Sequence, residues 1–333
     1  MATRFDFDPP NPDPLGVLLT TAPVARAADP VRLDPAAVEA FALAQRDAPL
    51  PRHAEEALHC TGLEPERFLN YLLALEALNF CFWDEPPRWT VRYRGASHDG
   101  YWALVAALHR AIHEDGVPLW DAAWLAEAAP ETLGHLLRGE GRPPPLLEVR
   151  AAHLREAGRV LLERWEGQFG RTVESCGGDA VTLALTVARE FPSFGDVARW
   201  RGREIRFYKR AQICAADLAR LLPDHPLGRL RGLERLTAFA DYKVPQVLRR
   251  EGILCLNPQL AARVDAGEPI PAGSEAEVAI RAATIWGCEW IARALTALRG
   301  RPVTAVEVDT LLWSAGQDKT GLPPYHRTRT IYY

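Results

Sequence analysis

Apolar residues recur every three or four positions along most of this chain, and that spacing leaves room for little besides a helical fold. Phe68, Leu72 and Leu75, for example, share one helical face. Asp34-Pro35 predicts a helix start, with Asp as N-cap and Pro at the first helical position. That first helix has Val38, Phe41 and Ala42 on one face, and nine more are predicted over about 64–80, 100–115, 119–128, 146–166, 178–190, 208–222, 245–252, 275–298 and 303–315.

Strand signals are few. The best is a hairpin made of 197–200 and 204–207 around Gly202. The sequence therefore predicts a mainly α protein with a minor β hairpin. Residues 1–34 are rich in proline and are predicted to be an N-terminal arm. Hydrophobic residues are spread evenly over 35–333 with no Gly/Ser linker, which predicts a single compact helical unit of two closely packed lobes.

The charge balance bears on the class of ligand. Lys and Arg total 39 and Asp and Glu total 43, which gives a net charge of −4. Proteins that bind nucleic acid tightly carry an excess of basic residues on one face. A small anionic ligand needs only two or three cations. The composition thus favours a small-molecule substrate, with no direct binding of nucleic acid.

The cysteines and histidines indicate whether the protein binds a metal, and the N-terminus indicates where in the cell it is found. The six cysteines occur singly, without zinc-finger spacing, and the histidines are judged to lack metal spacing, so neither a metal nor a cofactor is expected. The N-terminus lacks the apolar core of a signal peptide, and no apolar run is long enough to span a bilayer. We expect a cytoplasmic monomer that does not bind membranes.

An aromatic cluster follows the helix over 64–80. Phe80, Phe82 and Trp83 are interrupted only by Cys81, and Asp84 comes next. Such a cluster is most often core. The alternative is a stacking wall for a planar base, since an aromatic face gives about 1–3 kcal/mol per base. Phe82 and Asp84 would then lie at a ligand site.

The segment Tyr208-Lys209-Arg210 enters the helix over 208–222. Two cations in a first helical turn run against the helix dipole unless they have an anionic partner. Two interpretations stay open at this point. The pair is either a solvated surface pair or a phosphate site, where Lys209 supplies charge and helix N-terminal amides add donors.

Asp241 lies between aromatic neighbours in Phe239-Ala240-Asp241-Tyr242-Lys243, ahead of a helix predicted to have Pro245 at its first position. An Asp at this place is more often a helix cap than a catalyst. A nearby carboxylate can also stabilise the positive charge that glycosidic cleavage develops on a sugar ring, or bond to the sugar transiently. Lys243 would hold that carboxylate ionised or contact a phosphate.

The end of the chain carries further candidates. Asp309 and Trp313 occur in the last predicted helix, and the chain closes with an apolar Ile331-Tyr332-Tyr333. Free C-termini are usually polar and ragged, so this one is predicted to dock into the fold. His326, Arg327 and Arg329 would then act as salt-bridge partners or as anion ligands. Signatures of serine hydrolases, zinc proteases, P-loops and Rossmann folds are absent from the sequence.

Six segments taken together resemble the queuosine salvage protein family, in order along about residues 35–333. They are 79–83, 100–104, 191–194, 207–212, 239–246 and 326–333. The resemblance implies an N-glycosidase that releases queuine from queuosine 5′-phosphate for reuse in tRNA modification. It also implies a helical bundle-like fold related to the helix-hairpin-helix DNA glycosylases, with 35–333 as the catalytic unit.

The resemblance also implies residue roles. Asp241 matches the family's catalytic carboxylate, as nucleophile or oxocarbenium stabiliser. Phe239, Asp309 and Trp313 match positions that contact the nucleoside, and His59 fits the expected spacing better than His53. The phosphate would bind cations chosen from Lys209, Lys243, Arg327 and Arg329, with Lys209 favoured and Tyr208 beside it. The ammonium group of queuine would pair with Asp309 or Asp84.

Two other functions fit the sequence. A nucleic-acid glycosylase acting on a flipped base is the first, and the acidic net charge argues against it. A carrier that binds queuine or its nucleoside without cleaving it is the second.

Overall fold

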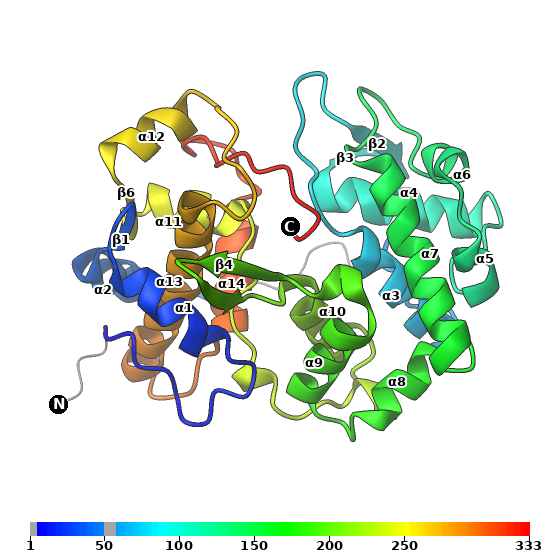
Figure 1. Ribbon diagram of the computed structural model, residues 1–333, viewed down its shortest axis with the longest axis horizontal. Helices are drawn as coiled ribbons and strands as arrows, with labels where there is room; N and C mark the ends of the chain where they lie inside the picture. The colour runs from blue at the N-terminus through cyan, green and yellow to red at the C-terminus, as the bar shows by residue number, and fades with distance from the viewer. Residues whose placement is uncertain (1–4, 50–57) are drawn as a thin grey trace. The chain divides into compact units, whose positions relative to one another are not determined.

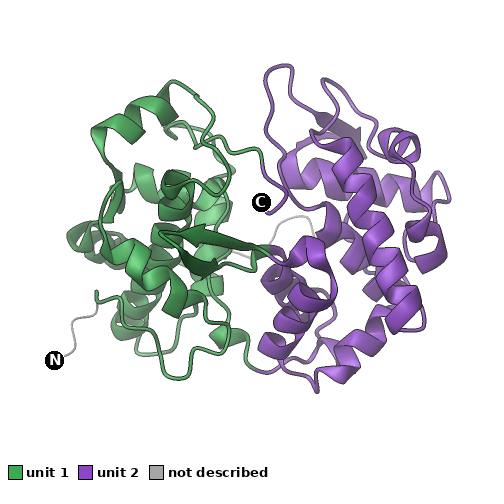
Figure 2. Ribbon diagram, in the orientation of Figure 1, with its two compact units in different colours: residues 1–53, 196–209, 232–329 green, residues 54–195, 210–231, 330–333 purple. Residues whose placement is uncertain are grey.

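The computed structural model describes residues 5–49 and 58–333, which form two compact units (Figures 1 and 2). Unit 1 comprises 1–53, 196–209 and 232–329, and unit 2 comprises 54–195, 210–231 and 330–333. Both are mainly helical, with only two-stranded antiparallel sheets among the described residues. The predicted fold class is confirmed at this level. No helix in these stretches has the length and apolar composition needed to cross a membrane.

Unit 1 is organised around the helix α13 (Glu275–Arg299), which has Ser274 as its N-cap and Gly300 in the left-handed conformation at its end. This helix is buried along most of its length because α1, α2, α11 and α14 all pack against it (Figure 1). The other helices of the unit are α1 (Val17–Arg26), α2 (Pro35–Ala44), the 3-10 turn η4 (Leu233–Arg235), α11 (Lys243–Arg250), α12 (Pro258–Asp265) and α14 (Ala305–Ala315).

Two small sheets belong to unit 1. The predicted hairpin is confirmed as β4 (Val197–Trp200) and β5 (Arg203–Arg206). Its turn residues Arg201 and Gly202 both have positive φ, as a two-residue hairpin requires. The second sheet pairs β1 (Val31–Leu33) with β6 (Leu254–Leu256), two strands far apart in sequence.

Unit 2 is built around α3 (Pro65–Leu78) and α7 (Leu147–Arg164), which pack against each other. Its hairpin pairs β2 (Thr90–Tyr93) with β3 (Ala96–Asp99) and leads directly into α4. The remaining helices are α4 (Gly100–His113), α5 (Ala122–Ala126), α6 (Pro130–Leu136), α8 (Phe169–Ser175), α9 (Ala180–Glu190), η2 (Pro192–Phe194), α10 (Lys209–Leu221, its first residue counted in unit 1) and η3 (Pro226–Gly228).

The C-terminal end of α3 is closed by two buried arginines. Arg210 donates to the carbonyls of Glu76 and Ala77, both at 2.9 Å, and Arg150 donates to Leu78, Phe80 and Cys81. Both guanidinium groups also lie over the ring of Phe80. The last carbonyls of a helix lack intrahelical partners and carry negative partial charge, so cations are favourable there.

The last residues of the chain dock into unit 2, as predicted. The Tyr333 side chain is buried, and its backbone oxygen accepts a hydrogen bond from the Cys81 amide at 2.8 Å. Cys81 has a positive φ of 46°, an uncommon conformation for a residue with a side chain. The terminus therefore pairs with the aromatic segment that follows α3.

Several elements were not predicted. The Pro-rich stretch 1–34 contains α1, which begins after Gly16 in the left-handed conformation and includes Pro23. The short helices α6, α8 and α12 were also missed, as were both sheets other than the 197–206 hairpin. These three helices have only seven or eight residues, about two turns each, so their periodic signal is weak.

A candidate site of paired carboxylates in unit 1

Asp241 caps the helix α11. Its Oδ1 accepts hydrogen bonds from the amides of Lys243 at 2.8 Å and Val244 at 2.9 Å. The capping interpretation of this residue is confirmed. The helix begins at Lys243, so placing Pro245 at the first helical position was wrong. Both bonds fall on Oδ1, and among the described residues none is made to Oδ2. The cap thus fixes the carboxylate and leaves its second oxygen for a ligand.

Asp309 is tied to the same segment. It lies on α14, whose start is fixed by a capping box between Thr304 and Glu307. The Asp309 Oδ1 accepts a hydrogen bond from the Phe239 amide at 2.8 Å. The structure therefore brings three predicted site residues, Phe239, Asp241 and Asp309, together in unit 1.

The two carboxylates are buried and interact electrostatically. Asp241 is 8% exposed and Asp309 is 5% exposed. Burial raises the pKa of Asp241, while the charge of Lys209 and the amides of Val244 and Lys243 oppose that rise. Burial and then the charge of Asp241 raise the pKa of Asp309 much further. Ionisation is therefore disfavoured more strongly at Asp309 than at Asp241.

Burial followed by the charges of Asp309 and Asp241 also raises the pKa of the Cys288 thiol. Cys288 lies on α13, so this helix carries a buried thiol close enough to both carboxylates to feel their charges. A neutral thiol there keeps the local dielectric low without adding charge. Low dielectric strengthens the coupling between Asp241 and Asp309.

Lys209 supplies the positive charge near both carboxylates. Its side chain is buried, with 6% exposed, so the interpretation of Lys209 and Arg210 as a solvated surface pair was wrong. Arg210 is buried as well and binds the end of α3, as described above. The charge of Lys209 lowers the pKa of Asp241 and of Asp309. A cation near an acid favours its ionised form.

The turn before Lys209 is held by Asp196. The Asp196 carbonyl accepts from the amides of Phe207 at 3.0 Å and Tyr208 at 3.1 Å, and its Oδ2 accepts from the Lys209 amide at 3.2 Å. Tyr208 has a positive φ of 50°, and its side chain is half-buried. Such a conformation costs on the order of 1–3 kcal/mol and persists where surrounding bonds impose it.

A buried arginine links the two halves of this site. Arg281 of α13 donates to Asp196 from both terminal nitrogens, one at 2.9 Å, and its Nε donates to the Ala240 carbonyl at 3.3 Å. Its guanidinium lies 3.8 Å from the centre of the Phe207 ring. One side chain thus holds the turn that carries Lys209 and the residue that precedes Asp241.

Neither Asp196 nor Arg281 was singled out from the sequence. A signal for Arg281 was present, because it lies three residues after Val278 and four before Ile285, on the apolar face of its helix. A charged residue at such a position is buried and needs a partner. Asp196 gave no comparable signal.

Lys243 and Trp313 lie around the same segment. The Lys243 Nζ donates to the Gly316 carbonyl at the end of α14, at 3.2 Å. Its charge contributes least among the groups that lower the pKa of Asp241. Trp313 follows Asp309 by four residues, so both are on one side of α14, and its ring is half-buried. The indole thus offers an aromatic face one helical turn from the carboxylate.

Arg327 contacts a different part of unit 1. Its carbonyl accepts from the Ile270 amide at 2.7 Å, and its guanidinium lies beside Gly267, after α12. The neighbouring His326 is buried, and burial with the charge of Arg281 lowers its pKa to about 3. His326 is therefore neutral, and its ring does not act as a cation. The phosphate role of Arg327 stays a prediction.

Three predicted site residues, His59, Phe82 and Asp84, belong to unit 2. Phe82 and Asp84 are half-buried, whereas the neighbouring Phe80 and Trp83 are core residues. His59 is buried, and its Nε2 makes a hydrogen bond with the Tyr101 hydroxyl at 2.9 Å. The roles of His59, Phe82 and Asp84 stay predictions. His53, the alternative to His59, lies outside the described residues.

A helical protein with two buried carboxylates of unequal pKa beside a lysine has the groups needed for acid–base chemistry or for stabilising a cationic sugar. The model of the queuosine salvage protein family matches residues 58–333, and the chain belongs to this family.

The relatives include a protein of Sphaerobacter thermophilus named queuosine 5′-phosphate N-glycosylase/hydrolase. It is 50% identical over 324 residues, which cover 96% of this chain and 98% of the relative. Proteins of the same name from Mus musculus and Dictyostelium discoideum are 35% and 34% identical, over 85% and 79% of this chain and 84% and 77% of theirs.

Proposed function

We propose that this protein hydrolyses the N-glycosidic bond of queuosine 5′-phosphate and releases queuine for salvage into tRNA modification. Relatives of that name match nearly the entire chain. The observation that carries the proposal is the carboxylate pair, in which Asp241 is fixed by two amides through one oxygen while Asp309 is bound to the Phe239 amide. That arrangement orients two acids whose ionisation is disfavoured to different degrees.

The reaction adds water across the bond between C1′ and the base, giving the free base and ribose 5-phosphate. Queuine is a 7-deazaguanine, so it cannot be activated by protonation at N7. Catalysis must therefore depend mainly on stabilising the positive charge that develops on the sugar as the bond breaks. The free Oδ2 of Asp241 would stabilise that charge or bond to C1′ for a time.

Asp309 is suited to a different role. A carboxyl group that stays protonated can donate a hydrogen bond to the departing base, or it can pair with the queuine ammonium once that charge lowers its pKa. Phe239 and Trp313 offer aromatic faces for a planar base. Asp84, Phe82 and His59 are further proposed substrate contacts, on the grounds of the sequence alone.

The phosphate would bind cations and so position C1′ against Asp241 through remote binding energy. Lys209 is the first candidate, followed by Lys243 and Arg327, with Tyr208 next to Lys209. We propose no cofactor and no metal for the hydrolysis. We further propose a fold related to the helix-hairpin-helix DNA glycosylases. Residues 1–34 would form an arm, and residues 35–333 the catalytic unit. The protein would act as a cytoplasmic monomer.

A product assay tests the proposed function. Purified protein is incubated separately with queuosine 5′-phosphate, with the free nucleoside and with intact tRNA containing queuosine, and the products are separated by chromatography. We expect queuine and ribose 5-phosphate from the nucleotide. Binding without free base would instead identify a carrier, and base release from intact tRNA would identify a nucleic-acid glycosylase.

A further inference from the structure

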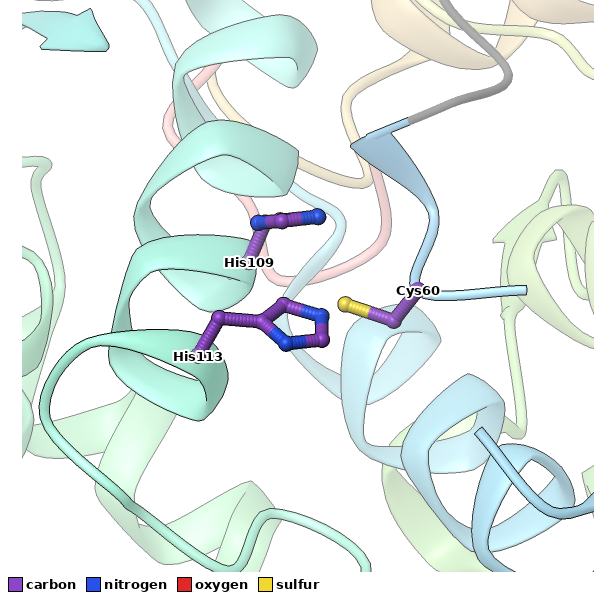
Figure 3. A group of neighbouring side chains, drawn as sticks. All are labelled: Cys60, His109 and His113. Atoms are coloured by element: carbon purple, nitrogen blue, oxygen red, sulfur yellow. The ribbon is translucent and has the colours of Figure 1, made fainter. Parts of the chain in front are cut away.

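Three potential metal ligands meet in unit 2, outside the carboxylate site. The Cys60 Sγ and one ring nitrogen each of His109 and His113 all lie within 4.8 Å of one another. Figure 3 shows the two imidazoles extending from α4 toward the thiol, which comes from the segment before α3. The expectation that the histidines lack metal spacing was wrong, because His109 and His113 are four residues apart on one helical face.

We propose that Cys60, His109 and His113 bind a divalent transition-metal ion, with zinc as the best fit. One thiolate and two imidazoles form a set of ligands that zinc uses with a water in the fourth position. Zinc–nitrogen and zinc–sulfur bonds of about 2.0–2.3 Å put ligand atoms roughly 3.5 Å apart in a tetrahedron. The observed atoms need to approach by only about 1 Å, and the exposed His113 side chain has room to rotate.

His109 is already oriented for this role. Its Nδ1 makes a hydrogen bond with the Tyr93 hydroxyl at 3.0 Å, which leaves Nε2 for a metal. A bond of this kind on the second ring nitrogen fixes the tautomer of a metal-binding histidine. The Tyr93 hydroxyl therefore orients the His109 ring before any metal binds.

The thiol must lose its proton. Burial raises the pKa of Cys60 to about 12, although the charge of Arg94 opposes the rise. Metal binding would release that proton to solvent, as it does in other thiolate sites. The exposed side of His113 supplies the route for the ion and for the leaving proton.

A metal here would join α4 to the segment that holds Cys60 and its neighbour His59. Between Cys60 and the start of α3 the chain forms no helix or strand, and Cys60 has a positive φ of 54°. The proposed ion would therefore act as a structural clip. It would hold His59 in place without taking part in bond cleavage.

Cobalt(II) provides a direct test on the full-length protein. After treatment with a chelator and its removal, Co²⁺ is titrated and the absorption spectrum is recorded. We expect one equivalent to bind, with the thiolate charge-transfer band and the visible bands of a tetrahedral site. Cys60→Ser should remove the charge-transfer band, and His113→Ala should weaken binding by at least roughly tenfold. Zn²⁺ should displace the cobalt.

Two matched variants serve as controls. Cys255→Ser removes a partly exposed thiol of unit 1, and His135→Ala removes a histidine of α6 in unit 2. Both should keep the full spectrum, and circular dichroism should show all four variants folded. His113 is exposed, so its replacement tests the site even if Cys60→Ser unfolds the protein. Absence of stoichiometric binding, or unchanged affinity in folded His113→Ala, would overturn the proposal.

Discussion

At the level of single residues, Asp241 performs two tasks with its two oxygens. Oδ1 caps α11 through the amides of Lys243 and Val244, and the proposed chemistry uses Oδ2. Asparagine keeps an Oδ1 acceptor at the same place but carries no charge. The Asp241→Asn variant therefore separates the structural task from the catalytic one.

We expect Asp241→Asn to fold normally and to lose base release by at least about 10²–10³-fold in kcat, the usual effect of removing one electrostatic stabiliser. The measurement is queuine formation from queuosine 5′-phosphate, with thermal unfolding as the check on folding. Asp265→Asn, which removes a partly exposed carboxylate paired with Arg249, is the control and should keep its activity. Near-normal turnover of Asp241→Asn would exclude Asp241 as the catalytic carboxylate.

Asp309 gives a prediction about stability and pH. Burial and the charge of Asp241 raise its pKa in the folded protein above the ordinary value of 3.8. The folded state then binds more protons than the unfolded state between these two pKa values, so stability falls as pH rises through that range. We expect Asp309→Asn to raise the Tm by a few degrees at pH 7, and the gain to disappear on acidification toward pH 4.

The Tm of Asp265→Asn should change in the opposite direction at pH 7. Hydrogen bonding to Arg249 lowers the pKa of Asp265, so its ionised form stabilises the fold above the unfolded pKa, and that contribution is lost as pH falls. Its removal should lower the Tm slightly at pH 7, because the pair is partly exposed. A Tm of Asp309→Asn equal to that of the wild type at every pH would contradict a raised pKa.

Lys209 has two possible roles that one substitution separates. Its charge lowers the pKa of Asp241, so Lys209→Ala should move the acid limb of the rate profile to higher pH with any substrate. If Lys209 also binds the 5′-phosphate, kcat/KM should fall much more for the nucleotide than for the nucleoside. Equal losses with the two substrates would remove the phosphate role. Lys319→Ala, in an exposed loop, is the matched control.

At the level of elements, the site depends on α13 more than on any segment predicted to contact substrate. Arg281 of this helix binds both Asp196 and the Ala240 carbonyl, although neither Arg281 nor Asp196 is expected to contact the base. Breaking a buried ion pair typically costs about 3–5 kcal/mol, because one charge is left without a partner. Glu277, one turn earlier on α13, also lies 3.7 Å from the Arg281 Nε and is buried, so a variant with Asp196 and Arg281 both replaced by apolar residues avoids only part of that cost.

We therefore expect Arg281→Met to lower the free energy of unfolding by about 3–5 kcal/mol, measured in urea. The double variant Asp196→Leu with Arg281→Met should recover part of this stability, because Glu277 still lacks Arg281. It should not recover kcat, because the Lys209 amide and the Ala240 carbonyl stay without their partners. Recovery of both quantities would show that the pair acts on stability alone.

Sequence periodicity predicted ten helices, and each has a counterpart in the structure within a few residues. The short helices α6, α8 and α12 gave too weak a periodic signal to be predicted, although α11, with eight residues, was predicted. The three-residue strands β1 and β6 left no signal, because they pair with each other across a large distance in sequence. The same limit applies to the site, because its distant contacts could not be predicted from the sequence. Asp241 was found from its segment and from family resemblance, whereas the Arg281–Asp196 pair joins residues 85 positions apart.

At the level of the whole molecule, neither unit is a continuous piece of chain. Each is assembled from three segments, and the chain passes from one unit to the other after residues 53, 195, 209, 231 and 329. Helix α10 begins in one unit and continues in the other. Unfolding of either unit therefore removes the constraints that hold the ends of the other unit's segments in place.

We expect a single cooperative thermal transition for the full chain, despite the two separate cores. The calorimetric enthalpy should equal the van't Hoff enthalpy, with roughly 0.7 kcal/mol per residue near 60 °C. Queuosine 5′-phosphate bound to Asp241→Asn should raise the Tm without splitting the transition. Two resolved transitions, only one of which responds to the nucleotide, would show units that unfold independently and a site formed by unit 1 alone.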